Sequence, residues 1–220
     1  MAKLPMIKTQ QFIKMLNNRE LKKEGKQYHI LLPENNSVLD MFNGFTNAPL
    51  QIINKISNSY IPEIRHQIYE NRKAITGKGL RDLFSNLNAG DEILIERRDV
   101  GNDVEFYIDL NIKSNLIIFQ KDAKGFLVLN NERLTQKLAN GIYEFRAFYN
   151  GSESEVEIEF IQSAKVRKDS SELSDFYNIS INGKKLSDGL KGSDYLELLE
   201  SGNGNYLKKT IPWQKYEFNN

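Results

Sequence analysis

The chain has 220 residues, of which 40% are hydrophobic and 27% are charged, and its formal net charge is +1. This is an ordinary globular composition with room for one generous domain or two small ones. Cysteine is absent, which excludes disulfides, thiolate metal sites and cysteine catalysis, and no run of about 18 apolar residues could cross a membrane.

The first ten residues, MAKLPMIKTQ, lack the apolar segment of a signal peptide. Together with the missing cysteines, this favours a cytoplasmic protein that has no membrane partner. The small net charge conceals two basic stretches, Arg19–Lys26 and Arg65–Arg81, which together carry +6 against −5 for the rest of the chain. Local positive potential of this kind attracts a phosphate backbone, although solvated basic loops would look the same in the sequence.

The first half of the chain alternates apolar runs of strand length with turns and two short helices. Ser37 is expected to cap a helix over 37–42 before Gly44, and a second helix is expected over 80–87. Pro62 is typical of an edge strand. Val104–Leu110 alternates apolar and polar residues, which predicts a strand with one buried face. The strands predicted in this half are 12–16, 28–32, 50–56, 60–69, 72–76, 92–96 and 104–110.

About seven strands in 112 residues are too many for a flat open sheet, so a closed or half-closed barrel is predicted. The second half continues β-rich, with one hairpin over 115–129 and another over 143–161 that turns at Asn150-Gly151. Residues 195–199 are predicted to form a helix that stops at Gly202. The expected fold is mainly β with short helices. Residues 1–112 form the first domain, and residues 113–220 either extend the barrel or form a small second domain.

The order of the predicted elements resembles the B3-like pseudobarrel, which is the DNA-binding domain of EcoRII and BfiI-type restriction enzymes and of plant B3 transcription factors. One stretch with this likeness runs from Phe12-Ile-Lys-Met-Leu-Asn-Asn through Gly25-Lys-Gln-Tyr-His-Ile-Leu-Leu-Pro33 to Met41-Phe42. The other runs from Gln67-Ile-Tyr-Glu-Asn-Arg-Lys-Ala-Ile-Thr76 to Asn88-Ala-Gly-Asp-Glu-Ile-Leu-Ile-Glu96. The likeness covers about residues 8–112, and the first basic arm, 17–27, is shorter and richer in lysine than is common in the bacterial family.

The resemblance implies site-specific binding of double-stranded DNA, in which two arms enter the major groove and the barrel rests on the backbone. Such a domain serves as the recognition module of a restriction system. One context is the N-terminal part of a LlaJI-type, McrBC-like restriction subunit, where a motor follows. A motor or nuclease subunit or domain is therefore an expected partner beside the DNA.

Residue chemistry agrees with this picture. An arginine fork matches the guanine edge and an asparagine amide matches the adenine edge, so Arg72 and Asn71 are expected to contact bases. Lys78 and Arg81, beside a helix start, are better placed for phosphate. Tyr69 and Thr76 offer hydroxyl or apolar contacts. The predicted DNA-binding residues are Lys22, Lys23, Lys26, Tyr69, Asn71, Arg72, Lys73, Thr76, Lys78 and Arg81.

A search for catalytic chemistry finds no P-loop motif and only two histidines, His29 and His66, which both lie in predicted strands. We therefore expect no metal, no cofactor and no catalytic residue in this chain, with any nuclease or NTPase activity elsewhere. The alternating carboxylates of 153–159 read as a solvated strand face. They also leave open a small Mg²⁺-dependent restriction endonuclease with its centre in the C-terminal half. A protein-interaction domain without a role in nucleic-acid binding is the third possibility.

Overall fold

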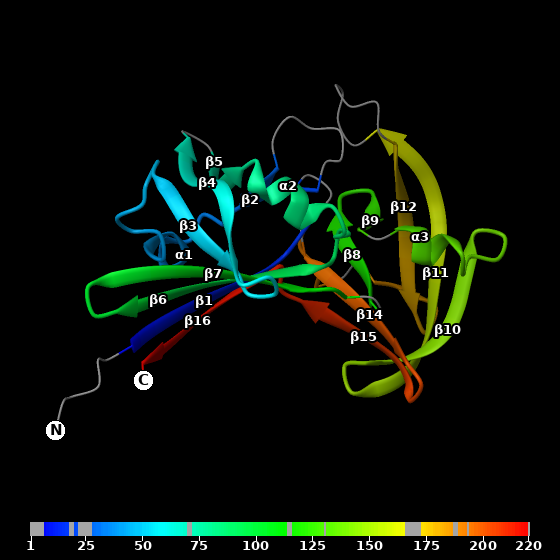
Figure 1. The fold of residues 1–220 in the computed structure, drawn as a ribbon. Helices are drawn as coiled ribbons and strands as arrows, with labels where there is room; N and C mark the ends of the chain where they lie inside the picture. Colours follow the sequence, from blue (N-terminus) through cyan, green and yellow to red (C-terminus); the bar gives the residue numbers. More distant parts are fainter. Residues whose placement is uncertain are drawn as a thin grey trace. The chain divides into compact units, whose positions relative to one another are not determined.

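The computed structural model describes residues 7–17, 20–21, 28–69, 72–113, 116–129, 131–165, 173–186, 189–192 and 194–219. The chain is mainly β with short helices, as the sequence predicts (Figure 1). It divides into two compact units: unit 1 comprises residues 1–113 and 213–220, and unit 2 comprises residues 114–212. None of the described helices has the length and apolar character needed to span a membrane.

Unit 1 is a curled eight-stranded sheet that forms a half-barrel. Seven of its strands and its two helices come from the first 112 residues, which confirms the predicted number of elements. The strands are β1 (Ile7–Met15), β2 (His29–Leu31), β3 (Pro49–Asn54), β4 (Ser59–Tyr69), β5 (Arg72–Gly77), β6 (Glu92–Val100), β7 (Asp103–Asn111) and β16 (Trp213–Asn219), and the helices are α1 (Asn36–Asp40) and α2 (Gly79–Phe84).

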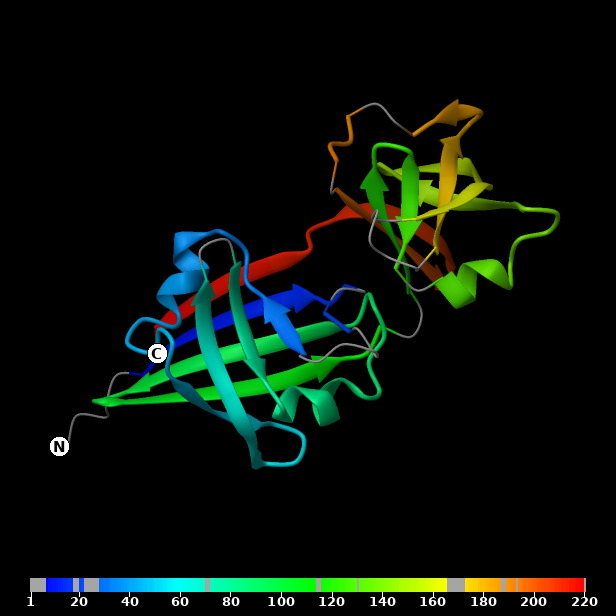
Figure 2. The same ribbon diagram turned by 90° about the horizontal axis from the view of Figure 1, so that it is seen from above.

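The strands of unit 1 are ordered β16-β1-β6-β7-β3-β4-β5-β2, and only the β3–β7 pair is parallel. Figure 2 shows how the sheet curls around the side that carries α1. Phe12, Phe42 and Phe106 are almost fully buried there, and the rings of Phe42 and Phe106 stack at 5.7 Å. Alternation along the strands places these apolar side chains on one face, so burial of that face stabilises the curl.

Two local predictions for unit 1 are wrong. The cap of α1 is Asn35 rather than Ser37, because the Asn35 side chain accepts a hydrogen bond from the Ser37 backbone N–H. β4 is an interior strand between β3 and β5 rather than an edge strand. Pro62 is tolerated because the β3–β4 register shifts between the Leu50–Ile64 and Ile52–Ile61 pairs. Pro62 lies in this bulge, where the sheet does not require the backbone N–H that proline lacks.

Unit 2 is a closed, mixed barrel of seven strands. The order is β11-β10-β15-β14-β8-β9-β12, and pairing of β11 with β12 closes the ring, while the short β13 extends from β12. A single cluster of buried side chains, including Phe119, Ile158, Leu196 and Leu198, fills it. Its elements are β8 (Leu116–Asp122), β9 (Gly125–Val128), α3 (Asn131–Thr135), β10 (Ile142–Tyr149), β11 (Ser152–Lys165), β12 (Leu173–Ile181), β13 (Lys184–Lys185), β14 (Tyr195–Ser201) and β15 (Gly204–Thr210).

Both predicted hairpins of the second half are confirmed as β8–β9 and β10–β11. Asn150 and Gly151 both have positive φ, as the two-residue turn between β10 and β11 requires. The helix predicted over 195–199 is wrong, because these residues lie in strand β14 between β8 and β15. Four consecutive side chains are buried at the start of β14, and such a short apolar run has the same pattern in a strand as in a helix.

Unit 2 is inserted into the sequence of unit 1. β16 returns after the barrel and pairs antiparallel with β1, so the red and blue strands run beside each other in Figure 2. Trp213 pairs with Lys14, Lys14 with Ile93, and Ile93 with Leu110. The chain therefore leaves and re-enters the sheet of unit 1 at the same end of its strands.

Candidate functional site

A hollow of about 1070 Å³ opens on unit 1 where β3, β4, β5 and α2 meet. Residues from four separate segments border it, so the sheet and the helix hold its shape together. The side chains and backbone around it belong to Tyr28, Pro49, Leu50, Gln51, Tyr60, Ile61, Pro62, Glu63, Ile64, Arg65, Thr76, Gly77, Lys78 and Arg81.

Two glycines let the chain cross closely over the bulge of β4 at this hollow. A Cβ on Gly77 would lie 2.0 Å from the carbonyl oxygen of Glu63, and one on Gly79 would lie 2.3 Å from that of Pro62. Gly77 also has a φ of +153°, which side chains rarely adopt. These two positions need glycine because the backbones at the end of β5 and the start of α2 lie too close to the β4 backbone to leave room for a side chain.

The close crossing brings three cationic side chains to one hollow. Arg65 comes from β4, Lys78 from the turn after β5, and Arg81 from α2, and all three are exposed. Lys78 forms an ion pair with Glu63 at 3.4 Å, but its side chain stays 88% exposed, so the pair contributes little stability. Among the described residues, neither Arg65 nor Arg81 forms an ion pair. Their charge is therefore available to an anionic ligand.

The structure brings together three of the predicted residues, namely Thr76, Lys78 and Arg81. The Thr76 hydroxyl donates to Gln67 Oε1 at 2.8 Å, which fixes its orientation. Lys73 lies on the other face of the sheet, because it alternates with Thr76 and shares the side of the buried Ile75. Lys73 and Thr76 therefore cannot face the same ligand directly.

The remaining predicted residues are placed only in part. Tyr69 and Arg72 are opposite each other at the ends of β4 and β5, and the structure describes only their backbone. Arg72 and Gly77 lie at opposite ends of β5. Lys22, Lys23, Lys26 and Asn71 lie outside the described residues.

Pairing of β2 with β5 fixes where the first basic arm rejoins the sheet. His29 is opposite Thr76, so Tyr28, which follows the arm directly, borders the hollow beside Gly77. The Tyr28 ring also meets the edge of Phe84 in α2 at 6.2 Å. Tyr28 therefore borders the same hollow as Lys78 and Arg81.

The other end of this arm is anchored by a buried ion pair. Lys14 Nζ lies 2.6 Å from Glu20 Oε1, and the Glu20 side chain is fully buried. Glu20 also accepts hydrogen bonds from the backbone N–H groups of Leu31 in β2 and of Asn17. Burial raises the pKa of Glu20, although Lys14 and these donors oppose the rise. Glu20 thereby ties the start of the arm to β2, next to β5.

Sequence reasoning missed three residues at the hollow: Arg65, Tyr28 and Tyr60. Arg65 begins the second basic stretch, but the predicted phosphate contacts are Lys78 and Arg81, which lie beside Gly77 and Gly79 farther along the chain. Its position in β4 opposite Thr76 depends on strand register, which the sequence does not specify. Tyr60 is 64% exposed and lies just before the bulge of β4.

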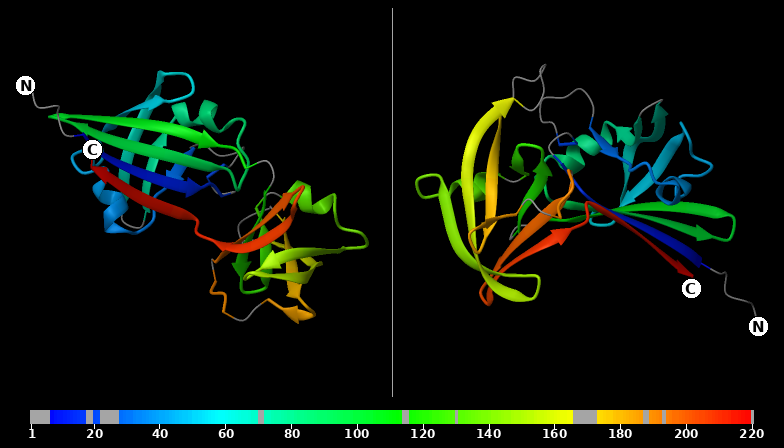
Figure 3. Two further views of the ribbon diagram at one scale, coloured as in Figure 1. Left: turned by 90° about the horizontal axis from the view of Figure 1, so that it is seen from below. Right: turned by 180° about the vertical axis from the view of Figure 1, so that it is seen from behind.

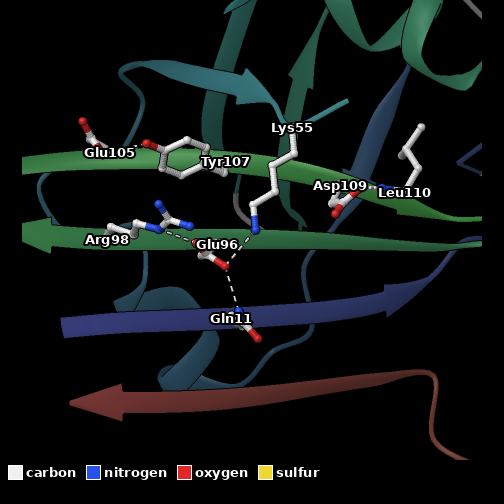
Figure 4. Close-up of polar contacts among 8 residues, drawn as sticks. All are labelled: Gln11, Lys55, Glu96, Arg98, Glu105, Tyr107, Asp109 and Leu110. Atoms are coloured by element: carbon white, nitrogen blue, oxygen red, sulfur yellow. Dashed lines mark hydrogen bonds and ion pairs between the residues drawn. The ribbon is translucent and has the colours of Figure 1, made fainter. Parts of the chain in front are cut away.

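A second polar cluster, centred on Glu96, lies on the face of the unit 1 sheet that points away from the core (Figure 4). Glu96 is 2% exposed and receives hydrogen bonds from Gln11 at 2.7 Å and Lys55 at 3.0 Å, with Arg98 on its other oxygen. Burial alone would raise the pKa of Glu96, but the three hydrogen bonds hold it below its usual value. The Arg98 guanidinium also covers the Tyr107 ring at 4.4 Å. Because these groups satisfy one another, the cluster ties β1, β6, β7 and the end of β3 together.

No group of three or more histidine, aspartate or glutamate side chains in the described part of the chain has the geometry of a metal site. Glu153, Glu155 and Glu159 are exposed on β11, and Glu157, on the same face, is half-buried. Glu157 is opposite Glu144 of β10 and Glu155 is opposite Arg146. The face is thus the solvated acidic strand surface that the alternation predicts.

No protein family, curated protein sequence or solved structure matches the chain. Its function is therefore argued from its own residues.

Proposed function

We propose that unit 1 is a site-specific double-stranded DNA-binding domain of the B3-like pseudobarrel type, and that it acts as the recognition module of a restriction system. One observation carries the proposal: Arg65 of β4, and Lys78 and Arg81 at the start of α2, border one hollow together with Tyr28, which follows the lysine-rich stretch in the sequence. A convergent cationic surface of this kind suits a phosphate backbone.

The chemistry of each side chain determines whether we assign it to phosphate or to base contacts. Lys78 and Arg81 contact phosphate, because both are exposed charges on a surface that other side chains leave open. Arg65 joins them as a third phosphate ligand. Arg72, at the start of β5, and Asn71, which precedes it in the sequence, read bases, and Lys22, Lys23 and Lys26 supply the other arm.

A buried framework supports the proposed interface. The bulge of β4, the two glycines of the crossing and the Glu20 anchor fix the segments that border the hollow. Phosphate ligands on such a frame need little ordering on binding, which favours a defined register on the duplex.

The test is selection of a binding site from a random duplex pool, followed by titration of the selected duplex at several salt concentrations. Lys78→Ala and Arg81→Ala are expected to weaken binding to all duplexes alike and to reduce the salt slope by about one each. Arg72→Ala is expected to lose about 1–3 kcal/mol of discrimination at one base pair. Lys184→Ala, an exposed lysine in unit 2, is the matched control and should change neither quantity.

Failure to enrich any sequence, or equal effects of Lys184→Ala and Arg81→Ala, would contradict the proposal. Incubation with plasmid and Mg²⁺ tests the second part of the proposal, namely that the chain recognises DNA without cleaving it. Specific cleavage by the purified chain would overturn the assignment as a recognition module and support a complete endonuclease.

A further inference from the structure

The free edge of the unit 1 sheet has the features of an interface. β16 pairs with β1 through seven consecutive residue pairs without a bulge, and none of the described strands pairs with its other side. Both views in Figure 3 show β16 as the outer border of this sheet. An edge strand of this length and regularity presents unpaired N–H and C=O groups to any second strand.

The opposite edge of the same sheet is protected in the usual ways. β2 has only three residues, and Pro33 follows shortly after it. Short length and proline are common means of preventing edge-to-edge pairing. β16 is also flanked by a proline, Pro212, but it has seven residues. It carries Tyr216 and Phe218, which are 42% and 45% exposed on the face away from the core.

We propose that β16 pairs antiparallel with β16 of a second copy of this chain, so that the two sheets become continuous. A two-fold axis perpendicular to the sheet keeps the core faces of both copies on one side and places a single residue on the axis. With Tyr216 on the axis, all seven residues of β16 overlap with the seven of the partner strand. Registers centred elsewhere leave part of the strand unpaired.

Charge complementarity favours the same register. With Tyr216 on the axis, Lys215 is opposite Glu217 of the second copy, and Glu217 is opposite its Lys215. These two side chains already form an ion pair within one chain at 2.5 Å, so the dimer would hold four charges of alternating sign. A register centred on Lys215 or on Glu217 would instead place like charges opposite each other, which destabilises a strand pair.

The partner is thus a second copy rather than an unrelated strand, because the sequence of β16 complements itself. On the outer face, Tyr216 meets Tyr216 of the second copy, and Gln214 meets Phe218. Pairing through one strand buries a small area, so we expect a weak dimer with a dissociation constant on the order of micromolar.

Sedimentation of the whole chain over about 1–200 µM tests the association. The expected result is a concentration-dependent shift from monomer to dimer. Tyr216→Arg and Tyr216→Glu should each remain monomeric, because each places like charges together on the axis. An equimolar mixture of the two variants should associate again. Both substitutions are at an exposed position, and thermal unfolding checks that the fold is retained.

Cross-linking tests the register directly, because the chain has no cysteine. Tyr216→Cys places two thiols within disulfide range across the axis and should form a covalent dimer on mild oxidation. Phe148→Cys, equally exposed at 42% but located in unit 2, is the matched control and should form far less. A monomer at all concentrations would overturn the proposal. So would a dimer that tolerates both Tyr216 charges, or equal cross-linking at the two positions.

Discussion

His66 shows how a buried polar residue sets a pH limit on stability. The side chain is 1% exposed and its ring lies 4.8 Å from that of Phe42, and neither ring nitrogen has a hydrogen-bond partner among the described residues. Burial lowers its pKa from the ordinary value of 6.5. The sequence predicts a strand at His66, and the structure places its side chain in the core.

The folded protein therefore takes up the His66 proton less readily than the unfolded chain. Stability contributed by the neutral ring is complete above about pH 6.5 and is lost as the pH falls from that value toward the lowered pKa. We expect His66→Phe, which removes this titration, to reduce the loss between pH 7 and pH 5. The difference is at most about 1.4 kcal/mol per pH unit. Urea unfolding at several pH values measures it, and parallel curves for the two proteins would contradict the prediction.

The Lys14–Glu20 pair offers a second prediction at the scale of the residue. Lys14→Met leaves the Glu20 carboxylate buried without its countercharge, so we expect a loss of about 3–5 kcal/mol at pH 7. Glu20→Gln added to this variant removes the second charge but keeps an oxygen for the N–H of Leu31. The double variant should therefore be more stable than Lys14→Met alone. Urea unfolding of the double-mutant cycle decides the point, and simple additivity would show that the charges do not interact.

At the scale of the element, the crossing of β5 and α2 over β4 depends on the absence of a side chain. A Cβ on Gly79 would lie 2.3 Å from the Pro62 oxygen and 2.5 Å from Ile61 Cγ2. We expect Gly79→Ala to destabilise unit 1 by about 2–4 kcal/mol, because backbone must move to admit the methyl group. It should also weaken DNA binding, since it displaces Lys78 and Arg81.

Gly192→Ala is the control for this change, because nothing lies within 4 Å of its added Cβ. Its effect on the free energy of unfolding, measured by thermal unfolding as for Gly79→Ala, should be within about 0.5 kcal/mol of zero. If Gly79→Ala is equally silent, the close crossing does not determine the shape of the hollow.

The elements show where sequence reasoning succeeds and where it stops. Asn150-Gly151 encodes its turn locally, because both residues tolerate positive φ, and the β10–β11 hairpin follows. Residues 195–199 carry no local signal of this kind, and only pairing with β8 and β15 makes them a strand. The candidate site divides in the same way: Lys78 and Arg81 could be predicted from their glycine-flanked turn. Arg65 and Tyr60 join them only through strand register.

At the scale of the whole molecule, the two units share no strand, and the barrel is an insertion between β7 and β16. Its entry and exit lie at one end of the unit 1 sheet, three strand spacings or about 14 Å apart. We expect unit 1 to fold when residues 114–212 are replaced by a linker of about eight glycines and serines, which spans this distance.

The shortened chain should unfold in one cooperative transition and bind the selected duplex with unchanged affinity. Circular dichroism during thermal unfolding and the same titration measure the two outcomes. A folded chain that no longer binds DNA would assign part of the interface to the barrel. A chain that does not fold would show that unit 1 requires the barrel.

The pairing of β1 with β16 also has a consequence for synthesis on the ribosome. One neighbour of β1 becomes available only after the whole barrel has been translated, which takes roughly 5–20 s at common elongation rates. During that interval the nascent sheet exposes the side of β1 that β16 will cover, while the barrel already has all its strands and can close on itself. β16, which is translated after unit 2, therefore completes the unit whose first strand, β1, is translated before it.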